Sequence, residues 1–355
     1  MPARAIINLQ ALRYNYRRAA ELSPMARVMP VIKARAYGHG MTEVAYALDQ
    51  AEQFAVATLD EALLLRANGL SKKILVLQGV NSKEQLLRAV QEEISLVVHQ
   101  QHQVALLESV ELPGRVNIWI KLDTGMHRLG FKVSDFDAIY QRCNKTSNKL
   151  NLHVLSHFAN ADDPDDPLTN QQLDRFLQAT RDCKVEKSIA NSAAICGPLD
   201  CQLDWVRPGI MLYGVHPMMA GTASELSLKP VMTLYSHLIA IHHRKRGDRI
   251  GYGGDWTCTE DMPVGIISIG YGDGYPRHAP SGTPVLIKGK RVSLVGRVSM
   301  DMICVDLRSC PDAKVGDEAT LWGEGLPVED IARAASTIAY ELLCRLTGRV
   351  KFIYT

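Results

Sequence analysis

The chain has 355 residues, of which 46% are hydrophobic and 22% charged, and its formal net charge at pH 7 is +2. This length allows two domains, and the near-neutral charge gives no reason to expect a nucleic-acid partner or an anionic membrane. No apolar run is long enough to span a membrane, and the first residues contain no signal stretch, so we expect a cytoplasmic protein. The eight cysteines lack CxxC and zinc-type spacing, which predicts reduced thiols and no metal site.

Short apolar runs alternate with helical patterns along the first part of the chain. Asn8 is a candidate N-cap, and Thr58 with Glu61 and Ser82 with Gln85 form capping pairs for two further helices. The runs that we interpret as strands are 28–32, 54–57, 74–78, 94–98, 116–121, 152–157, 187–192 and 205–210. Eight strands that alternate with helices predict an α/β fold, a closed parallel (β/α)8 barrel of the TIM type.

The pattern changes after Gly214. Residues 217–230 have the composition of a linker, and short strands separated by glycine-containing turn pairs follow it. One helical stretch is predicted at about 328–346. The predicted strands of this part are 233–242, 264–269, 283–287, 293–298 and 302–307. We therefore divide the chain into a barrel, residues 1–226, and a smaller β-rich C-terminal domain, residues 227–355.

Polar side chains stand at or near the ends of several predicted barrel strands. They are Lys33, Lys121, His157, Ser192 and Arg207. The carboxyl ends of the strands carry the chemistry in such barrels. Lys33 directly follows a buried strand, where desolvation lowers the pKa of an amine and makes it nucleophilic enough to form a Schiff base. Taken alone, this stretch favours the plainer interpretation, a lysine that extends to solvent from a strand end.

Together these residues resemble a site for pyridoxal 5'-phosphate, which needs a Schiff-base lysine, a partner for the pyridine nitrogen and a phosphate cradle. Arg207 suits the pyridine nitrogen, although a surface ion pair is the alternative. Because arginine does not give up its proton, the ring would stay unprotonated, which favours simple proton exchange over transamination or decarboxylation. Ser192 and Gly209 end the seventh and eighth strand regions, where barrels commonly bind phosphate. A helix-capping serine and a turn glycine are the plain alternatives.

Seven segments resemble motifs of one known family. Residues 31–40, Val-Ile-Lys-Ala-Arg-Ala-Tyr-Gly-His-Gly, resemble the signature around the cofactor-binding lysine of alanine racemases. Six further segments are similar to motifs of that family and follow in the same order: 121–131, 156–159, 190–194, 205–210, 270–277 and 295–301. The resemblance extends along the whole chain and implies a homodimer that binds pyridoxal 5'-phosphate and racemises alanine.

The resemblance also implies the two bases of the reaction. Lys33 would act on D-alanine, and Tyr271 of the partner subunit would act on L-alanine from the opposite face, so that the active sites are shared. His157 would lie near the cofactor ring and link Tyr271 to Arg207 by hydrogen bonds. From the residues alone, Tyr271 stands between glycines at the end of an apolar run, where packing of an aromatic ring is the alternative.

Further residues would hold the phosphate and the substrate. The resemblance assigns the phosphate to Tyr37, Ser192, Gly209 and Ile210. It assigns the substrate carboxylate to Arg128 and the backbone N–H of Met300, and Lys121 can be carbamylated in family members and orient Arg128. Three positions depart from the family. Arg35 replaces the usual asparagine, Gly272 replaces an alanine, and Gly348 stands where some members have a tyrosine. These departures bear on cofactor affinity and turnover more than on the reaction class.

The predicted function is therefore the interconversion of L-alanine and D-alanine. A racemase of serine or lysine on the same scaffold is the nearest alternative, since one methylene or hydroxyl changes discrimination only modestly. A non-catalytic protein that binds pyridoxal phosphate is the alternative from another class. Such a protein would need neither Tyr271 nor Arg128 nor the second domain.

Overall fold

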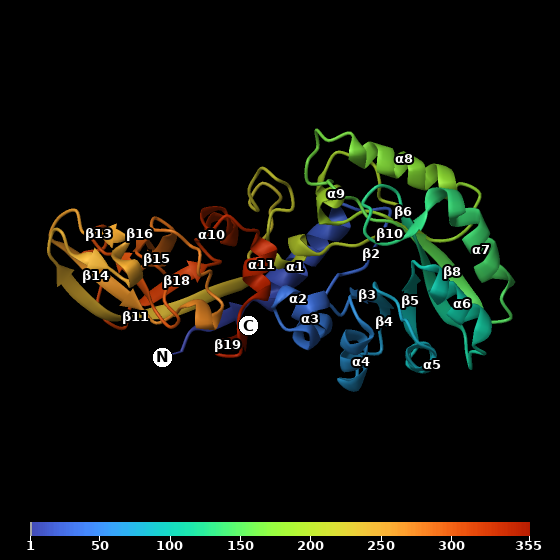
Figure 1. Cartoon of the computed structure of the whole chain (residues 1–355), viewed down its shortest axis with the longest axis horizontal. Coiled ribbons are helices and arrows are strands. Elements are labelled where there is room, and N and C mark those ends of the chain that lie inside the picture. Colours follow the sequence, from blue (N-terminus) through green and yellow to red (C-terminus); the bar gives the residue numbers. More distant parts are fainter. Residues whose placement is uncertain (1) are drawn as a thin grey trace.

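The computed structural model describes residues 2–355 and has two parts, a barrel and a β-rich part that lie side by side along the long axis (Figure 1). Eight parallel strands form the nearly closed barrel in the order β2-β10-β9-β8-β6-β5-β4-β3, and a parallel bridge between Val31 and Ala55 joins its two ends. The strands are β2 (Arg27–Val28), β3 (Gln53–Val56), β4 (Lys73–Val76), β5 (Ile94–Val98), β6 (Val116–Asp123), β8 (Leu150–Leu155), β9 (Lys187–Ser188) and β10 (Trp205–Val206). The predicted (β/α)8 architecture is confirmed.

Three barrel strands are shorter than predicted. β2, β9 and β10 span two residues each, whereas runs of five or six residues were predicted there. Beyond them the chain continues through separate backbone hydrogen bonds, such as Val31 N–H to the carbonyl of Pro208. Pro30 and Pro208 have no N–H to add to the ladder, so regular pairing stops and the segments turn towards the cavity.

Helices cover the outside of the barrel. They are α1 (Leu9–Glu21), α3 (Met41–Ala47), α4 (Leu59–Ala67), α5 (Lys83–Gln91), α6 (Gln101–Ser109), α7 (Phe136–Lys145) and α8 (Leu168–Thr180). Two short segments, α2 (Lys33–Tyr37) and α9 (Ser192–Cys196), lie at the carboxyl ends of the barrel strands. Asn8 accepts a hydrogen bond from Ala11 N–H, so the predicted N-cap is confirmed. Thr58 and Glu61 form a complete capping box. In α5, Leu86, Ala89 and Val90 are buried, the spacing of one helix face.

The second part is built on an eight-stranded sheet in the order β14-β17-β16-β15-β18-β11-β1-β19. Its strands are β1 (Arg4–Ile7), β11 (Met232–Arg244), β14 (Met262–Ile267), β15 (Pro284–Ile287), β16 (Lys290–Val295), β17 (Ile303–Asp306), β18 (Glu318–Trp322) and β19 (Lys351–Tyr354). β12 (Arg249–Ile250) and β13 (Trp256–Thr257) form a separate hairpin. The first strand of the chain, β1, therefore belongs to the C-terminal sheet, where it pairs with β11 and β19.

The predicted helical stretch at 328–346 is wrong in one respect. It is two helices, α10 (Val328–Ala334) and α11 (Ala339–Cys344). Ser336 between them has φ 51°, a left-handed conformation that ends a right-handed helix. The break lets α11 lie against α2 so closely that a Cβ on Gly38 would be 2.0 Å from the carbonyl oxygen of Leu343. Within residues 2–355, no helix is both long and apolar enough to cross a membrane.

Candidate active site

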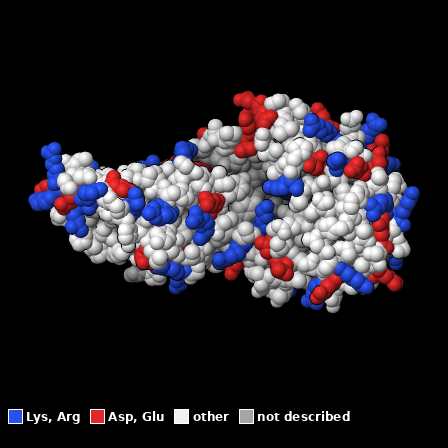
Figure 2. All heavy atoms as spheres, viewed as in Figure 1, with Lys and Arg blue, Asp and Glu red and all other residues white. Residues whose placement is uncertain are grey.

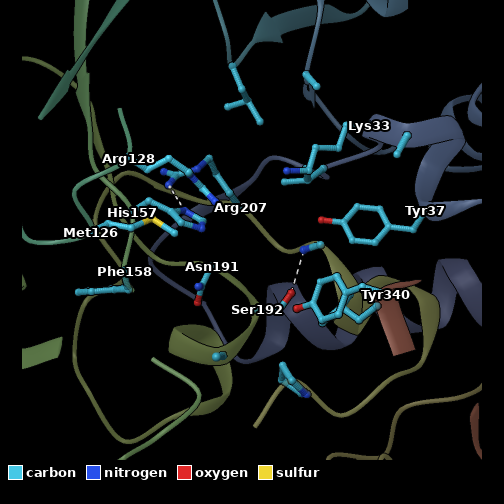
Figure 3. A pocket seen from close by; sticks show the side chains of 18 of the residues that line it. Lys33, Tyr37, Met126, Arg128, His157, Phe158, Asn191, Ser192, Arg207 and Tyr340 are labelled. Atoms are coloured by element: carbon cyan, nitrogen blue, oxygen red, sulfur yellow. Dashed lines mark hydrogen bonds between the residues drawn. The ribbon is translucent and has the colours of Figure 1, made fainter. Parts of the chain in front are cut away.

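A cavity of about 670 Å³ opens at the carboxyl ends of the barrel strands (Figure 3). The barrel residues predicted for the site line it: Lys33, Tyr37, Lys121, Arg128, His157, Ser192, Arg207, Gly209 and Ile210. On the face shown in Figure 2, blue lysine and arginine atoms border a hollow between the two parts, and red acidic atoms gather above it. The structure thus brings the predicted barrel residues together around one positively charged space.

Lys33 begins a turn of unusual handedness. The four residues after it, Ala34 to Tyr37, have φ of 53°, 55°, 55° and 53°. A left-handed turn of residues with side chains costs on the order of 1 kcal/mol per residue, and contacts from elsewhere must impose it. The main contacts are the hydrogen bond from Ala34 N–H to Glu61 (2.7 Å) and the packing of α11 on Gly38. The turn places the Lys33 amine and the Tyr37 hydroxyl on the cavity (Figure 3).

Two amines in the cavity have lowered pKa values. Burial lowers the pKa of Lys33 first, and the nearby guanidinium of Arg128 lowers it further. Burial also lowers the pKa of Lys121 to about 8, with further contributions from Arg207 and Arg128. A larger fraction of each amine is therefore neutral near physiological pH than for an exposed lysine, as nucleophilic and basic chemistry requires.

Arg207 is a buried cation, 4% exposed, that is held from several sides. Its Nη1 donates to Ser188 Oγ and its Nη2 to the carbonyl of Ser156, both at 2.5 Å. Nη2 also lies 3.4 Å from Nδ1 of His157. Burial lowers the pKa of His157 well below its usual value, and Arg207 adds to this effect. His157 is therefore neutral, and because an arginine only donates, Nδ1 accepts and the ring proton is on Nε2.

Hydroxyl and N–H groups meet at one end of the cavity. Ser192 Oγ accepts hydrogen bonds from Gly209 N–H (2.8 Å) and Met211 N–H (3.4 Å). A Cβ on Gly209 would lie 2.4 Å from the Tyr37 hydroxyl, so only glycine leaves room for this approach. Two hydroxyls and a backbone segment without a side chain thus form a cradle that fits a phosphate ester. The residues present fit pyridoxal phosphate, with the phosphate at this end and Lys33 beside it.

Arg128 stands on the loop after β6, with its guanidinium in the cavity (Figure 3). Asp123 shapes this loop by accepting hydrogen bonds from Gly125 N–H and His127 N–H, both at 3.0 Å. Among residues 2–355, no carboxylate forms an ion pair with Arg128. An unpaired guanidinium fork in such a space is suited to a carboxylate ligand.

Two predicted site residues lie elsewhere. Tyr271 and Met300 are on loops of the C-terminal part, and they are 38% and 53% exposed. Tyr271 N–H donates to the carbonyl of Ser299 at 3.1 Å, so the two loops are neighbours. Neither residue lines the cavity formed by residues 2–355 of one chain. A single chain does not bring them to Lys33.

Another exposed tyrosine, Tyr252, was not among the site residues predicted from the sequence. Tyr252 lies between glycines in the β12–β13 hairpin and is 69% exposed. A Cβ on Gly251 would lie 3.6 Å from the backbone nitrogen of Arg297, so this hairpin adjoins the segment that leads to Met300. The available signal was a tyrosine between glycines, which Tyr252 shares with Tyr271. Cavity residues that had no prior signal are Asp162, Tyr340 and Cys344.

Two family models match the chain, the alanine racemase N-terminal domain over residues 7–217 and the alanine racemase C-terminal domain over residues 231–354. The chain belongs to the alanine racemase family. Alanine racemases of Nitrosococcus oceani and Coxiella burnetii are 50% and 47% identical to it over 349 and 358 residues. These alignments cover 98% and 99% of this chain, and 97% and 98% of the relatives.

Solved structures agree with this assignment. The crystal structure of biosynthetic alanine racemase from Pseudomonas aeruginosa is similar to this chain with a TM-score of 0.97 and 44% identity, covering 100% of this chain and 99% of that one. An alanine racemase from Acinetobacter baumannii gives a TM-score of 0.92 and 37% identity, with both chains fully covered. Of the functions that the sequence left open, the comparisons support an enzyme that interconverts L-alanine and D-alanine.

Proposed function

We propose that this alanine racemase binds pyridoxal 5'-phosphate covalently at Lys33 and uses the Lys33 amine as one of two bases. The observation that carries the proposal is the meeting of Lys33, the Tyr37–Ser192–Gly209 cradle and the buried Arg207 in one cavity. When bound, pyridoxal phosphate withdraws electrons from an amino acid attached to it and makes the Cα proton removable. Ile210 begins the short turn after Gly209 and completes the cradle.

Other barrel residues would bind the cofactor ring and the substrate. Arg207 would hold the pyridine nitrogen as a fixed cation, and His157 accepts from Arg207 and would offer its Nε2 proton to the site. Arg128 binds the substrate carboxylate and so orients the Cα hydrogen towards a base. Lys121, with a pKa of about 8, is available in its neutral form for carbamylation by carbon dioxide, which releases a proton. The amine beside Arg128 would then become an anion and could pair with the guanidinium.

The second base would come from a partner subunit. Within residues 2–355, the tyrosines that line the cavity are Tyr37, whose hydroxyl belongs to the phosphate cradle, and Tyr340. Burial raises the pKa of Tyr340 to about 12, which makes it a poor base. The C-terminal part of a second copy offers Tyr271, as predicted, and also Tyr252. We place Tyr252 first, because a hydroxyl that must enter another subunit's cavity has to stand clear of its own chain, and Tyr252 is the more exposed.

The assembly that follows is a cytoplasmic homodimer with shared active sites and with alanine as its small-molecule partner. The barrel of residues 1–226 would bind the cofactor, and residues 227–355 would complete the partner's site. The backbone N–H of Met300 supports this arrangement. Among residues 2–355 it has no hydrogen-bond acceptor, and it lies on an exposed loop, free to bind a substrate carboxylate in another chain.

Turnover with and without the cofactor tests the proposal. Purified protein stripped of its cofactor should not convert L-alanine to D-alanine until pyridoxal phosphate is added back. L-serine and L-lysine serve as competing substrates, and we expect alanine to have the highest kcat/KM. Full activity of the stripped protein would show that the reaction does not need pyridoxal phosphate. A higher kcat/KM for serine or lysine would show that alanine is not the preferred substrate.

A further inference from the structure

The carboxylate of Glu61 bonds to two separate segments of the barrel. Its Oε1 accepts a hydrogen bond from Ala34 N–H at 2.7 Å. Its Oε2 accepts from Ala57 N–H at 2.7 Å and from Thr58 N–H at 3.3 Å. Glu61 stands in the first turn of α4, directly after β3. One side chain thus connects the end of a barrel strand to the residue that follows Lys33.

The capping box accounts for only one of these three bonds. A capping box needs the glutamate to accept from the N-cap residue, here Thr58, and the bond to Ala34 adds nothing to it. That bond is made at the first of the four left-handed residues, where the chain leaves its ordinary conformation. No other acceptor for Ala34 N–H exists among residues 2–355. Without Glu61, this amide would have only solvent to bond with, and the turn would lose a contact that imposes its handedness.

We propose that Glu61 is a positioning residue for Lys33. Its carboxylate holds the left-handed turn against the end of β3. The position of this turn directs the Lys33 amine into the cavity. The inference rests on the proposed function, in which Lys33 binds the cofactor and acts as a base. A base displaced by about 1 Å from its productive position loses up to about 100-fold in rate, so a contact one residue away affects turnover without touching the substrate.

The chain provides matched controls for this test. Thr58→Ala removes the other half of the same capping box, the acceptor for Glu61 N–H (3.3 Å), and leaves the Ala34 bond in place. Gln85→Ala removes an equivalent cap on α5, where Gln85 accepts from Asn81 N–H at 3.0 Å and does not line the cavity. Glu61→Gln has a single acceptor oxygen, which cannot serve both segments because its amide nitrogen is a donor. Glu61→Ala removes both bonds.

Two measurements test whether Glu61 positions Lys33. The first is amide hydrogen exchange at Ala34, in the protein with pyridoxal phosphate and after the cofactor is removed. We expect exchange about tenfold faster in both Glu61 variants, the effect of losing one hydrogen bond to a charged group, and no change in the two controls. The second is steady-state kinetics with alanine. We expect kcat to fall by about 10- to 100-fold in the Glu61 variants, with KM within about twofold of wild type.

The outcomes separate this inference from the proposed function. Equal loss of kcat in Glu61→Gln and Thr58→Ala would mean that Glu61 only caps α4, and unchanged exchange at Ala34 in Glu61→Gln would also overturn the inference. Thermal unfolding of all four variants shows whether lost stability accounts for lost rate. If wild-type protein with pyridoxal phosphate did not racemise alanine, the proposed function would fail, whereas the exchange of Ala34 in the cofactor-free protein would still decide whether Glu61 holds the turn.

Discussion

The cavity of the barrel and the exposed loops of the C-terminal part present the residues of the proposed site in opposite ways. In the barrel, the functional groups are buried and bonded to one another, as Arg207 is to Ser188 and Ser192 is to Gly209. In the C-terminal part, Tyr252 and Met300 are more than half exposed and do not line the cavity that residues 2–355 form at the carboxyl ends of the barrel strands. In the proposed shared site, one half would therefore be preformed within a single chain, and the other half would be presented on the surface of its partner. The difference indicates that cofactor binding and turnover have separate structural requirements.

The largest effect is expected from the preformed half. Lys33→Ala removes the covalent attachment of the cofactor and one base together, so racemisation should fall by more than about 10,000-fold. The absorbance of the covalently bound cofactor should disappear, while the cradle of Tyr37, Ser192 and Gly209 retains some affinity for its phosphate. Equilibrium dialysis with pyridoxal phosphate and an alanine racemisation assay measure the two effects. Retained activity would mean that Lys33 is neither the cofactor attachment site nor a required base.

A substitution in the exposed half should slow racemisation without loss of cofactor binding. Tyr252→Phe should slow racemisation by about 1,000-fold, since a base loses its hydroxyl, and should leave cofactor binding unchanged. Both directions must slow by the same ratio of kcat/KM, because the equilibrium constant is fixed. Tyr271→Phe is the direct comparison, and the variant with the larger loss identifies the second base. Equal, near-normal rates in both variants would exclude a tyrosine of the C-terminal part.

Mixed dimers show whether the tyrosine acts in the partner's site. In a heterodimer of Lys33→Ala and Tyr252→Phe subunits, a shared-site arrangement puts both changes in one site and none in the other. Activity should return on mixing, to roughly a quarter of wild type for random exchange of subunits. The same mixture made with Tyr271→Phe serves as the comparison. Exchanged dimers that stay inactive would place the tyrosine in the site of its own subunit.

Arg207→Glu should change the type of reaction more than the fold. A carboxylate at this place, protonated or not, can share a proton with the pyridine nitrogen, and the cofactor then becomes a stronger electron sink. We expect racemisation to slow by roughly 100-fold, with an increase in transamination, measured as pyruvate formed from alanine. Arg207→Lys keeps a buried cation and should retain the preference for racemisation. Unchanged rates and products in Arg207→Glu would mean that Arg207 does not interact with the ring nitrogen.

Much of the preformed half was predictable from local sequence. Apolar runs marked the eight strands, and polar residues at their ends marked the cavity, because the carboxyl ends of barrel strands always meet at one face. The left-handed turn was not predictable. The residues Ala34 to Tyr37 have no local preference for it, and contacts from Glu61 and from α11, more than 300 residues away, impose it. Sequence also predicted Glu61 only as a cap, since its second bond depends on tertiary packing.

The exposed half was harder to predict for a different physical reason. Tyr252 and Tyr271 share one local pattern, a tyrosine between two glycines, and this pattern cannot show which hydroxyl reaches another chain. The strands β1 and β19 were also missed. Each has four residues, and their pairing joins the two ends of the chain, which no local signal reveals.

The smallest expected effect concerns how the loops of the C-terminal part are held. Arg349 connects Asp273, in the Tyr271 loop, at 3.1 Å to Asp301, beside Met300, at 2.7 Å. The guanidinium occupies the space next to Gly272, where a Cβ would lie 2.6 Å from its Nη1. A glycine at position 272 thus makes room for a bridge between the two loops.

Arg349→Gln should therefore raise the KM for alanine about threefold, the scale of a half-exposed ion pair, because the Met300 N–H loses its fixed position. Gly272→Ala should displace the guanidinium and have a similar effect, and the double variant should be no worse than Arg349→Gln alone, since both changes break one contact. Arg308→Gln is the control, because Arg308 also bridges two carboxylates, Asp306 and Glu260, and touches neither loop. Steady-state kinetics with L-alanine and D-alanine measure these effects. Fully additive losses in the double variant would show that Gly272 and Arg349 act independently, and the bridge would then have no part in substrate binding.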